Sequence, residues 1–115
     1  MIEGRVYVVT GGATGIGFGI TRVLCGYGAR VAGARLFLGD VSEPEGWFRE
    51  VLESYGAVDG LVNNAAVTGV AAIAPFLEAS RAHIDSMLVV NLKGPVLCSQ
   101  LAARADTTPE LPDLG

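Results

Sequence analysis

The stretch Thr10–Gly17, TGGATGIG, separates two segments whose apolar residues follow different patterns. Before it, Val6 to Val9 is a continuous β-branched and aromatic run, which predicts a strand buried on both faces of a parallel sheet. After it, apolar residues from Ile16 to Tyr27 recur at helical spacing. A glycine-rich turn at such a junction lets the backbone approach a phosphate and directs the free N–H groups of the helix N-terminus at it. A tight strand-to-helix turn without a ligand is the alternative interpretation.

Further along the chain, short apolar runs alternate with segments of helical periodicity. This alternation predicts an α/β protein with a Rossmann-like, doubly wound parallel sheet. The predicted strands after the first are Ala29–Ala34 and Val58–Val62, and the predicted helices after the first are Phe48–Tyr55 and Ser80 to about Ala103. We therefore expect one partial domain over residues 1–104, followed by a polar, Pro-rich and disordered tail over 105–115.

The composition is that of a globular chain: of 115 residues, 50% are apolar and 17% are charged. The net charge of −4 argues against nucleic acid or an anionic membrane as the main partner. Cys25 and Cys98 lie in apolar, helix-like contexts, which predicts buried free thiols rather than a disulfide framework or a metal site. With neither a secretion signal nor a membrane span recognisable, we predict a cytoplasmic protein.

The connection after the second predicted strand is too short for a complete sheet of this class. Only the residues Val31–Gly39 lie between Arg30 and Asp40, whereas a crossover between parallel strands takes a dozen residues or more. Either Ala29–Leu38 forms one long strand, or a crossover helix has been lost from this region. We favour the second interpretation, a truncated sheet that lacks one crossover helix.

Four motifs follow one another in a characteristic order. They are the Thr-Gly-x-x-x-Gly-x-Gly of residues 10–17, the pair Asp40-Val41, the run Asn63-Asn64-Ala65-Ala66, and Asn91 within VVNLKGP. Over residues 5 to about 104 the chain thereby resembles the N-terminal part of the short-chain dehydrogenase/reductase family, and most of all its carbonyl- and sugar-reductase members. The resemblance implies an oxidoreductase that moves a hydride between NAD(P) and an alcohol or carbonyl.

The resemblance also implies roles for individual residues. The glycine-rich motif, with Thr10, would line the pyrophosphate and the nicotinamide ribose through Gly11, Gly15, Ile16 and Gly17. Asp40 would accept a hydrogen bond from the adenine amino group, and Val41 would lie against the ring. Asn63 would hold the sheet together, and Ala65 would pass close to the adenosine ribose. Arg35 stands near the place of the family's ribose-binding acidic residue, which favours NADP over NAD.

Asn91 would be the helix asparagine of the family's catalytic tetrad. Pro95, four residues later, has no N–H with which to bond the Asn91 carbonyl. That carbonyl is therefore free to hold a water of a proton relay. Asn91 falls between Leu88 and Leu92 on an apolar stripe, so we expect its side chain to point inward. A buried asparagine at a helix kink is the alternative.

The family's remaining catalytic groups have no counterpart in these residues. The tyrosines are Tyr7, Tyr27 and Tyr55, and none has a lysine four positions later, so no Tyr-x-x-x-Lys exists, and the orienting Ser is absent with it. His83 is a lone, solvated histidine by its position on a helix flank. We expect no turnover, with a small carbonyl or alcohol substrate used only by a full-length form.

Two other interpretations remain open. One is a non-catalytic module that binds a nucleotide or a partner protein, and the other is a partly folded fragment. In each case the apolar face of the helix Ser80–Ala103 and the open edge of the sheet would be exposed, which predicts self-association.

Overall fold

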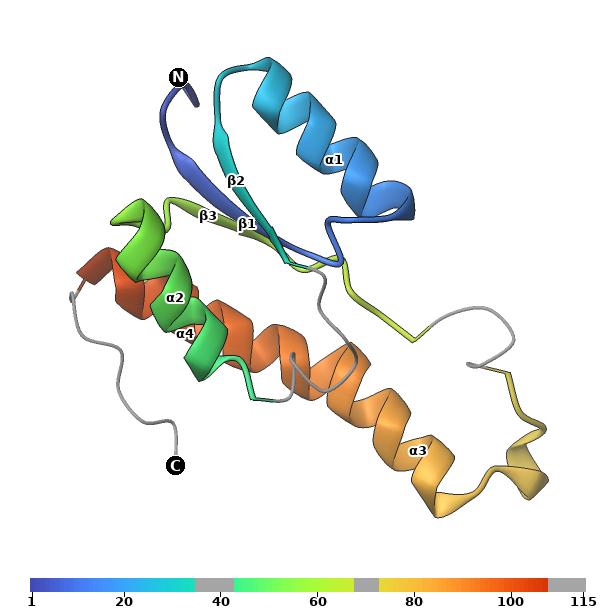
Figure 1. Ribbon diagram of the computed structural model, residues 1–115. Coiled ribbons are helices and arrows are strands. Elements are labelled where there is room, and N and C mark those ends of the chain that lie inside the picture. Colours follow the sequence, from blue (N-terminus) through green and yellow to red (C-terminus); the bar gives the residue numbers. More distant parts are fainter. Residues whose placement is uncertain (35–42, 68–72, 108–115) are drawn as a thin grey trace.

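The computed structural model describes residues 1–34, 43–67 and 73–107 (Figure 1). The first half of the chain alternates strands and helices: β1 (Val6–Thr10), α1 (Gly15–Gly26), β2 (Arg30–Ala34), α2 (Glu45–Tyr55) and β3 (Gly60–Val62). The second half is helical: the 3-10 turn η2 (Phe76–Glu78), α3 (Arg81–Leu88), the π-helical segment η3 (Val89–Lys93) and α4 (Gly94–Thr107). The structure confirms the predicted strands and helices. The boundaries of the strands differ from the predicted ones by a few residues at most.

The three strands form one parallel sheet in the order β2-β1-β3. β1 lies in the middle, where Val8 is paired with Ala32 of β2 on one side and with Leu61 of β3 on the other. α1 covers one face of this sheet, while α2 and α4 lie together on the opposite face (Figure 1). The predicted doubly wound α/β fold is therefore confirmed.

The core lies between the sheet and the pair α2 and α4. Val6 and Val8 of β1 are buried there beside Phe48 of α2 and beside Cys98 and Leu101 of α4. Alternate residues of a strand point to opposite faces, so the apolar positions 6 and 8 share one face and meet the two helices. Together with α2, the helix α4 thus covers one face of β1, the strand that leads into the glycine-rich motif.

The predicted long helix of the second half is present, with a π-helical segment in its middle (Figure 1). Pro95 supplies no N–H to the preceding turn, and one widened turn accommodates that loss. The N–H of Gly94 accordingly donates to the carbonyl of Val89, five residues back. At its start, the Ser80 hydroxyl caps the helix by accepting from the N–H of His83 at 3.1 Å.

The far end of this helix corrects one boundary. α4 runs to Thr107, so residues 105–107 of the predicted disordered tail are helical. The reason is packing, because Ala105 lies against the core next to Ala102. Residues 108–115, the rest of the predicted tail, lie outside the described residues.

The connection from β2 to β3 contains α2 as its helix. Between β2 and α2 the structure describes only residues 43 and 44, so the region from which a crossover helix is predicted to be lost lies outside the described residues. The alternative, a strand reaching Leu38, falls on residues 35–42, outside the described residues. Within the described ranges, no helix is long and apolar enough to cross a bilayer, and no group of His, Cys, Asp or Glu is placed to hold a metal.

Candidate cofactor site

The glycine-rich loop leaves β1 at Thr10 and becomes α1 at Gly15. Two of its glycines have positive φ, +65° at Gly11 and +55° at Gly15, a region that disfavours side chains. Thr14 precedes the helix in an extended conformation, and its side chain makes no capping bond. The N–H groups of the first turn of α1 are therefore left for another acceptor.

The space in front of that first turn is open. A Cβ built on Gly15 would meet no atom within 4 Å, and Thr14, Gly15 and Ile16 are all exposed. The loop carries no Lys or Arg, so an anion there would be held by backbone N–H groups and the helix dipole. This geometry fits a pyrophosphate, for which a cradle of glycines and a helix N-terminus is the common protein solution.

Gly17 lets the helix approach the loop closely. It is buried, and a Cβ on it would clash with the carbonyl oxygen of Gly11 and with Nδ2 of Asn64. Thr21, one turn later, holds the same junction: its hydroxyl donates to the carbonyl of Gly17 at 3.0 Å and lies 3.3 Å from that of Gly12. The first turn of α1 is thus packed directly on the loop.

The end of β3 holds the loop from the other side. Thr10 is buried, and its Oγ1 accepts hydrogen bonds from the backbone N–H groups of Asn64 and Ala65, both at 3.0 Å. The side-chain amide of Asn64 donates to the carbonyls of Thr10 at 3.1 Å and Gly11 at 3.3 Å. Because these bonds join two strand ends, they set the shape of the loop between them.

The sheet-holding role expected of Asn63 is therefore carried by its neighbour, Asn64. Asn63 is exposed, and its side-chain amide donates to Oγ of Ser99 at 3.1 Å, which ties the end of β3 to α4. Successive side chains at a strand end point in opposite directions, so only one of the two asparagines faces β1. Asn63 joins a helix to the sheet instead.

Asn91 lies in the π-helical segment, and the expectation that its side chain points inward is wrong. The side chain is exposed and pairs twice with the backbone of Val67: Oδ1 accepts from the N–H at 2.8 Å, and Nδ2 donates to the carbonyl at 3.3 Å. The stripe on which the prediction rested faces outward, as Leu88 is 52% exposed and Leu92 is 60% exposed. The buried positions nearby are Val90, Gly94 and Cys98.

The structure brings together Thr10, Gly11, Gly17 and Ala65, with Gly15 and Ile16 at the open rim of the loop. Arg35, Asp40 and Val41, the residues expected around the adenosine, lie outside the described residues. The sequence reasoning missed Asn64 and Thr21. The role of Thr21 could have been predicted from its spacing, because it stands four residues after Gly17 and therefore lies one helical turn along the same face.

Cys98 lies away from the loop, in the core beside Val6 and Val8 of β1. Burial, and to a smaller extent the nearby Glu45 carboxylate, raises the pKa of the Cys98 thiol to about 11. A neutral thiol in the core between α4 and the sheet acts as an apolar side chain. Its predicted burial is confirmed, whereas Cys25, also predicted to be buried, is exposed on α1.

A parallel sheet with helices on both faces, whose central strand runs through a glycine-rich turn into a helix, is the arrangement of doubly wound α/β proteins. The family model described as short chain dehydrogenase matches residues 33–108, more than half of the chain. The chain therefore belongs to the short-chain dehydrogenase family.

Named relatives support this membership. The chain is 37% identical to L-xylulose reductase of Homo sapiens over 119 residues and 32% identical to an uncharacterized oxidoreductase of Thermotoga maritima over 127 residues. Each alignment covers 90% of this chain and 48% of the relative, so the chain spans about half the length of the curated relatives it matches.

Solved structures agree with the fold. A short-chain dehydrogenase/reductase from Serratia marcescens superposes with a TM-score of 0.79 at 28% identity, over 90% of this chain and 53% of its own. The 3-oxoacyl-[acyl-carrier protein] reductase from Brucella melitensis in complex with NAD has a TM-score of 0.73 at 30% identity, over 94% and 51% of the two chains.

The alignment lengths bear on the predicted loss of a helix. The alignments span 119 and 127 positions, whereas 90% of the 115 residues of this chain is about 104. The differences, roughly 15 and 23 positions, are residues of the relatives without a counterpart here, about one helix with its loops. This supports a sheet that lacks one crossover helix.

Proposed function

We propose that this chain is the cofactor-binding part of an NAD(P)-dependent oxidoreductase, which transfers a hydride between a nicotinamide and an alcohol or carbonyl. The observation that carries the proposal is the loop itself. Gly11 and Gly15 adopt left-handed backbone angles, Gly15 faces open space, and the first turn of α1 has no side-chain cap. Nothing in a tight turn without a ligand requires all three together.

In this proposal the N–H groups at the start of α1 bind the pyrophosphate, and Gly11 and Ile16 line it. Ala65, whose N–H is held by Thr10, places the end of β3 beside the loop, where the adenosine ribose would lie. Asp40 and Val41 would contact the adenine. Arg35 would favour a 2′-phosphate, and hence NADP.

Asn91 is proposed as the remaining member of a proton relay. Its side chain is hydrogen-bonded to the backbone of Val67, so the group that would hold a water is its backbone carbonyl. That carbonyl receives no hydrogen bond from Pro95, because proline has no N–H. The 115 residues hold no Tyr-x-x-x-Lys to donate the proton. We therefore expect cofactor binding without turnover, and chemistry on a small carbonyl or alcohol only where a longer form supplies those groups. Relatives named for L-xylulose and sorbitol favour a polyhydroxylated substrate.

The test is a titration with NADPH and NADH, followed by nicotinamide fluorescence. The Gly15→Asp variant places a carboxylate where the pyrophosphate would lie and tolerates the left-handed angle, while Gly19→Asp adds the same charge on the same helix, where a Cβ also meets nothing within 4 Å. We expect at least a tenfold weaker Kd in Gly15→Asp than in Gly19→Asp. Equal affinities in the two variants would contradict the assigned loop.

The second candidate function is a non-catalytic nucleotide-binding or partner-binding module. It is favoured by the lack of a Tyr-x-x-x-Lys among the 115 residues. Both candidates predict binding, and they separate when the 115-residue chain is mixed with short alcohols, ketoses and cofactor. Sustained change in nicotinamide absorbance at 340 nm would exclude the module and would also overturn our expectation of no turnover.

A further inference from the structure

β2 is an edge strand of the described sheet. β1 pairs with one of its sides, and none of the residues that the structure describes pairs with the other. The N–H of Arg30 donates to Arg5, toward β1, at 2.8 Å. Because the backbone groups of a strand alternate in direction, Val31 and Gly33 present their N–H and C=O groups at the outer side. An edge of this kind is a template for another strand.

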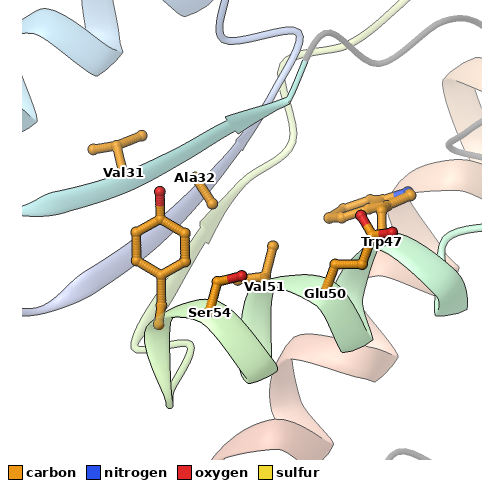
Figure 2. A pocket seen from close by; sticks show the side chains of 7 residues that line it. Val31, Ala32, Trp47, Glu50, Val51 and Ser54 are labelled. Atoms are coloured by element: carbon orange, nitrogen blue, oxygen red, sulfur yellow. The ribbon is translucent and has the colours of Figure 1, made fainter.

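A pocket of about 310 Å³ lies along this edge, between β2 and α2 (Figure 2). Val31 and Ala32 line it from the strand, and Trp47, Glu50, Val51 and Tyr55 line it from the helix. The helix runs opposite to the strand. Tyr55 lies near the start of β2, because the guanidinium of Arg30, the first residue of that strand, is 5.0 Å from its ring centroid. Trp47 and Glu50 lie toward the end of β2 (Figure 2).

We propose that a second copy of this chain pairs with this edge, β2 against β2, in an antiparallel two-fold arrangement. The positions that face outward set the register. With the two-fold axis at Ala32, Val31 of each copy lies opposite Gly33 of the other, and both pairs exchange N–H···O bonds. Every outward N–H and C=O within the pair of edge strands is then satisfied, and the two three-stranded sheets become one sheet of six strands.

Charge complementarity favours a second copy over an unrelated peptide. In this register the first residue of one β2 lies opposite the last residue of the other, so Arg30 of one copy reaches the end of the edge where Glu50 and Trp47 of its partner stand. Arg30 is the only charged residue of β2, and both Arg30 and Glu50 are exposed. The two-fold axis repeats the ion pair, so each copy supplies the cation and the carboxylate that the other needs.

The test is a set of charge reversals in the 115-residue chain, with the dimer Kd measured by sedimentation equilibrium. Glu50→Arg and Arg30→Glu should each weaken the dimer about tenfold, because each reversal turns two attractions into repulsions. The double variant restores the pairs and should return the Kd to within about threefold of the parent. Glu53→Arg is the matched control: it makes the same change on an exposed residue of α2 outside the pocket, and it should leave the Kd unchanged.

Amide hydrogen exchange followed by NMR gives an independent readout. The amides of Val31 and Gly33 should exchange at least tenfold more slowly above the dimer Kd than below it, whereas that of Arg30, already bonded to Arg5, should not change. A monomer at all concentrations, or a dimer insensitive to both single reversals, overturns the proposal. So does exchange at Val31 and Gly33 that does not depend on concentration, the outcome expected if another segment or peptide occupies the edge.

Discussion

Replacing Gly17 by alanine tests the closest contact in the cofactor loop. The added Cβ would lie 2.8 Å from the carbonyl carbon of Gly11 and closer still to the carbonyl oxygen of Gly11 and to Nδ2 of Asn64. Two of these atoms are backbone, and the third is held by bonds to Thr10 and Gly11. None can move without opening the junction between β1, β3 and α1.

The expected cost follows from these contacts. Overpacking of a well-packed site costs about 1–3 kcal/mol, and displacement of the Asn64 amide loses about 1 kcal/mol of hydrogen bonding. Alanine returns about 1 kcal/mol, because it is the better helix former. The net change in the free energy of unfolding is a loss of about 2 kcal/mol, which at about 4 °C per kcal/mol lowers Tm by about 8 °C.

The assay is thermal and urea unfolding followed by circular dichroism, with Gly19→Ala as the control. Gly19 lies two residues later in the same helix, and a Cβ on it meets nothing within 4 Å, so the control should gain about 0.5–1 kcal/mol. NADPH affinity should fall at least tenfold in Gly17→Ala only. A Gly17→Ala protein as stable as Gly19→Ala would refute the packing argument.

Three further predictions concern other parts of the chain. At pH 8 Cys98, with its pKa raised from 9.0 to about 11, should react with iodoacetamide about a hundredfold more slowly than an ordinary thiol, and Cys25 should be labelled first. Since the folded pKa lies above the unfolded one, the stability that Cys98 contributes is full below pH 9 and is lost as the pH rises toward 11, as urea midpoints should show. Leu88→Gln with Leu92→Gln should reduce light scattering at high protein concentration without lowering Tm, because both side chains are more than half exposed. Asn64→Ala should cost about 1–2 kcal/mol of unfolding free energy, since two loop carbonyls lose their donor.

The layout of the sheet could be predicted because each of its signals is local. The run Val6–Val9 is apolar at every position, as a strand covered on both faces requires, and the helical spacing begins directly after Gly15. The glycines that the loop needs at positive φ stand where the motif predicted them, at 11 and 15. None of these inferences depends on contacts between distant parts of the chain.

The predictions that failed concern contacts that a local pattern does not show. Ile84, Leu88, Leu92 and Val96 form an apolar stripe, yet they are 46–60% exposed both before and after the π turn, so the stripe does not turn the Asn91 side chain inward. At the end of β3, a shift of one residue decides whether Asn63 or Asn64 faces β1. The end of α4 is set by the packing of Ala105 on the core, which local composition does not show.

The cofactor loop differs from the edge of β2 and from the stripe of Leu88 and Leu92 in how far the described residues satisfy its contacts. The bonds that shape the loop join Thr10, Gly11 and Gly17 to Thr21 and the end of β3, so its form is complete within those contacts. Among the described residues, no strand pairs with the outer side of β2, and Leu88 and Leu92 are more than half exposed. Cofactor binding and self-association should therefore respond to different substitutions, and a variant that removes one while sparing the other follows from the structure.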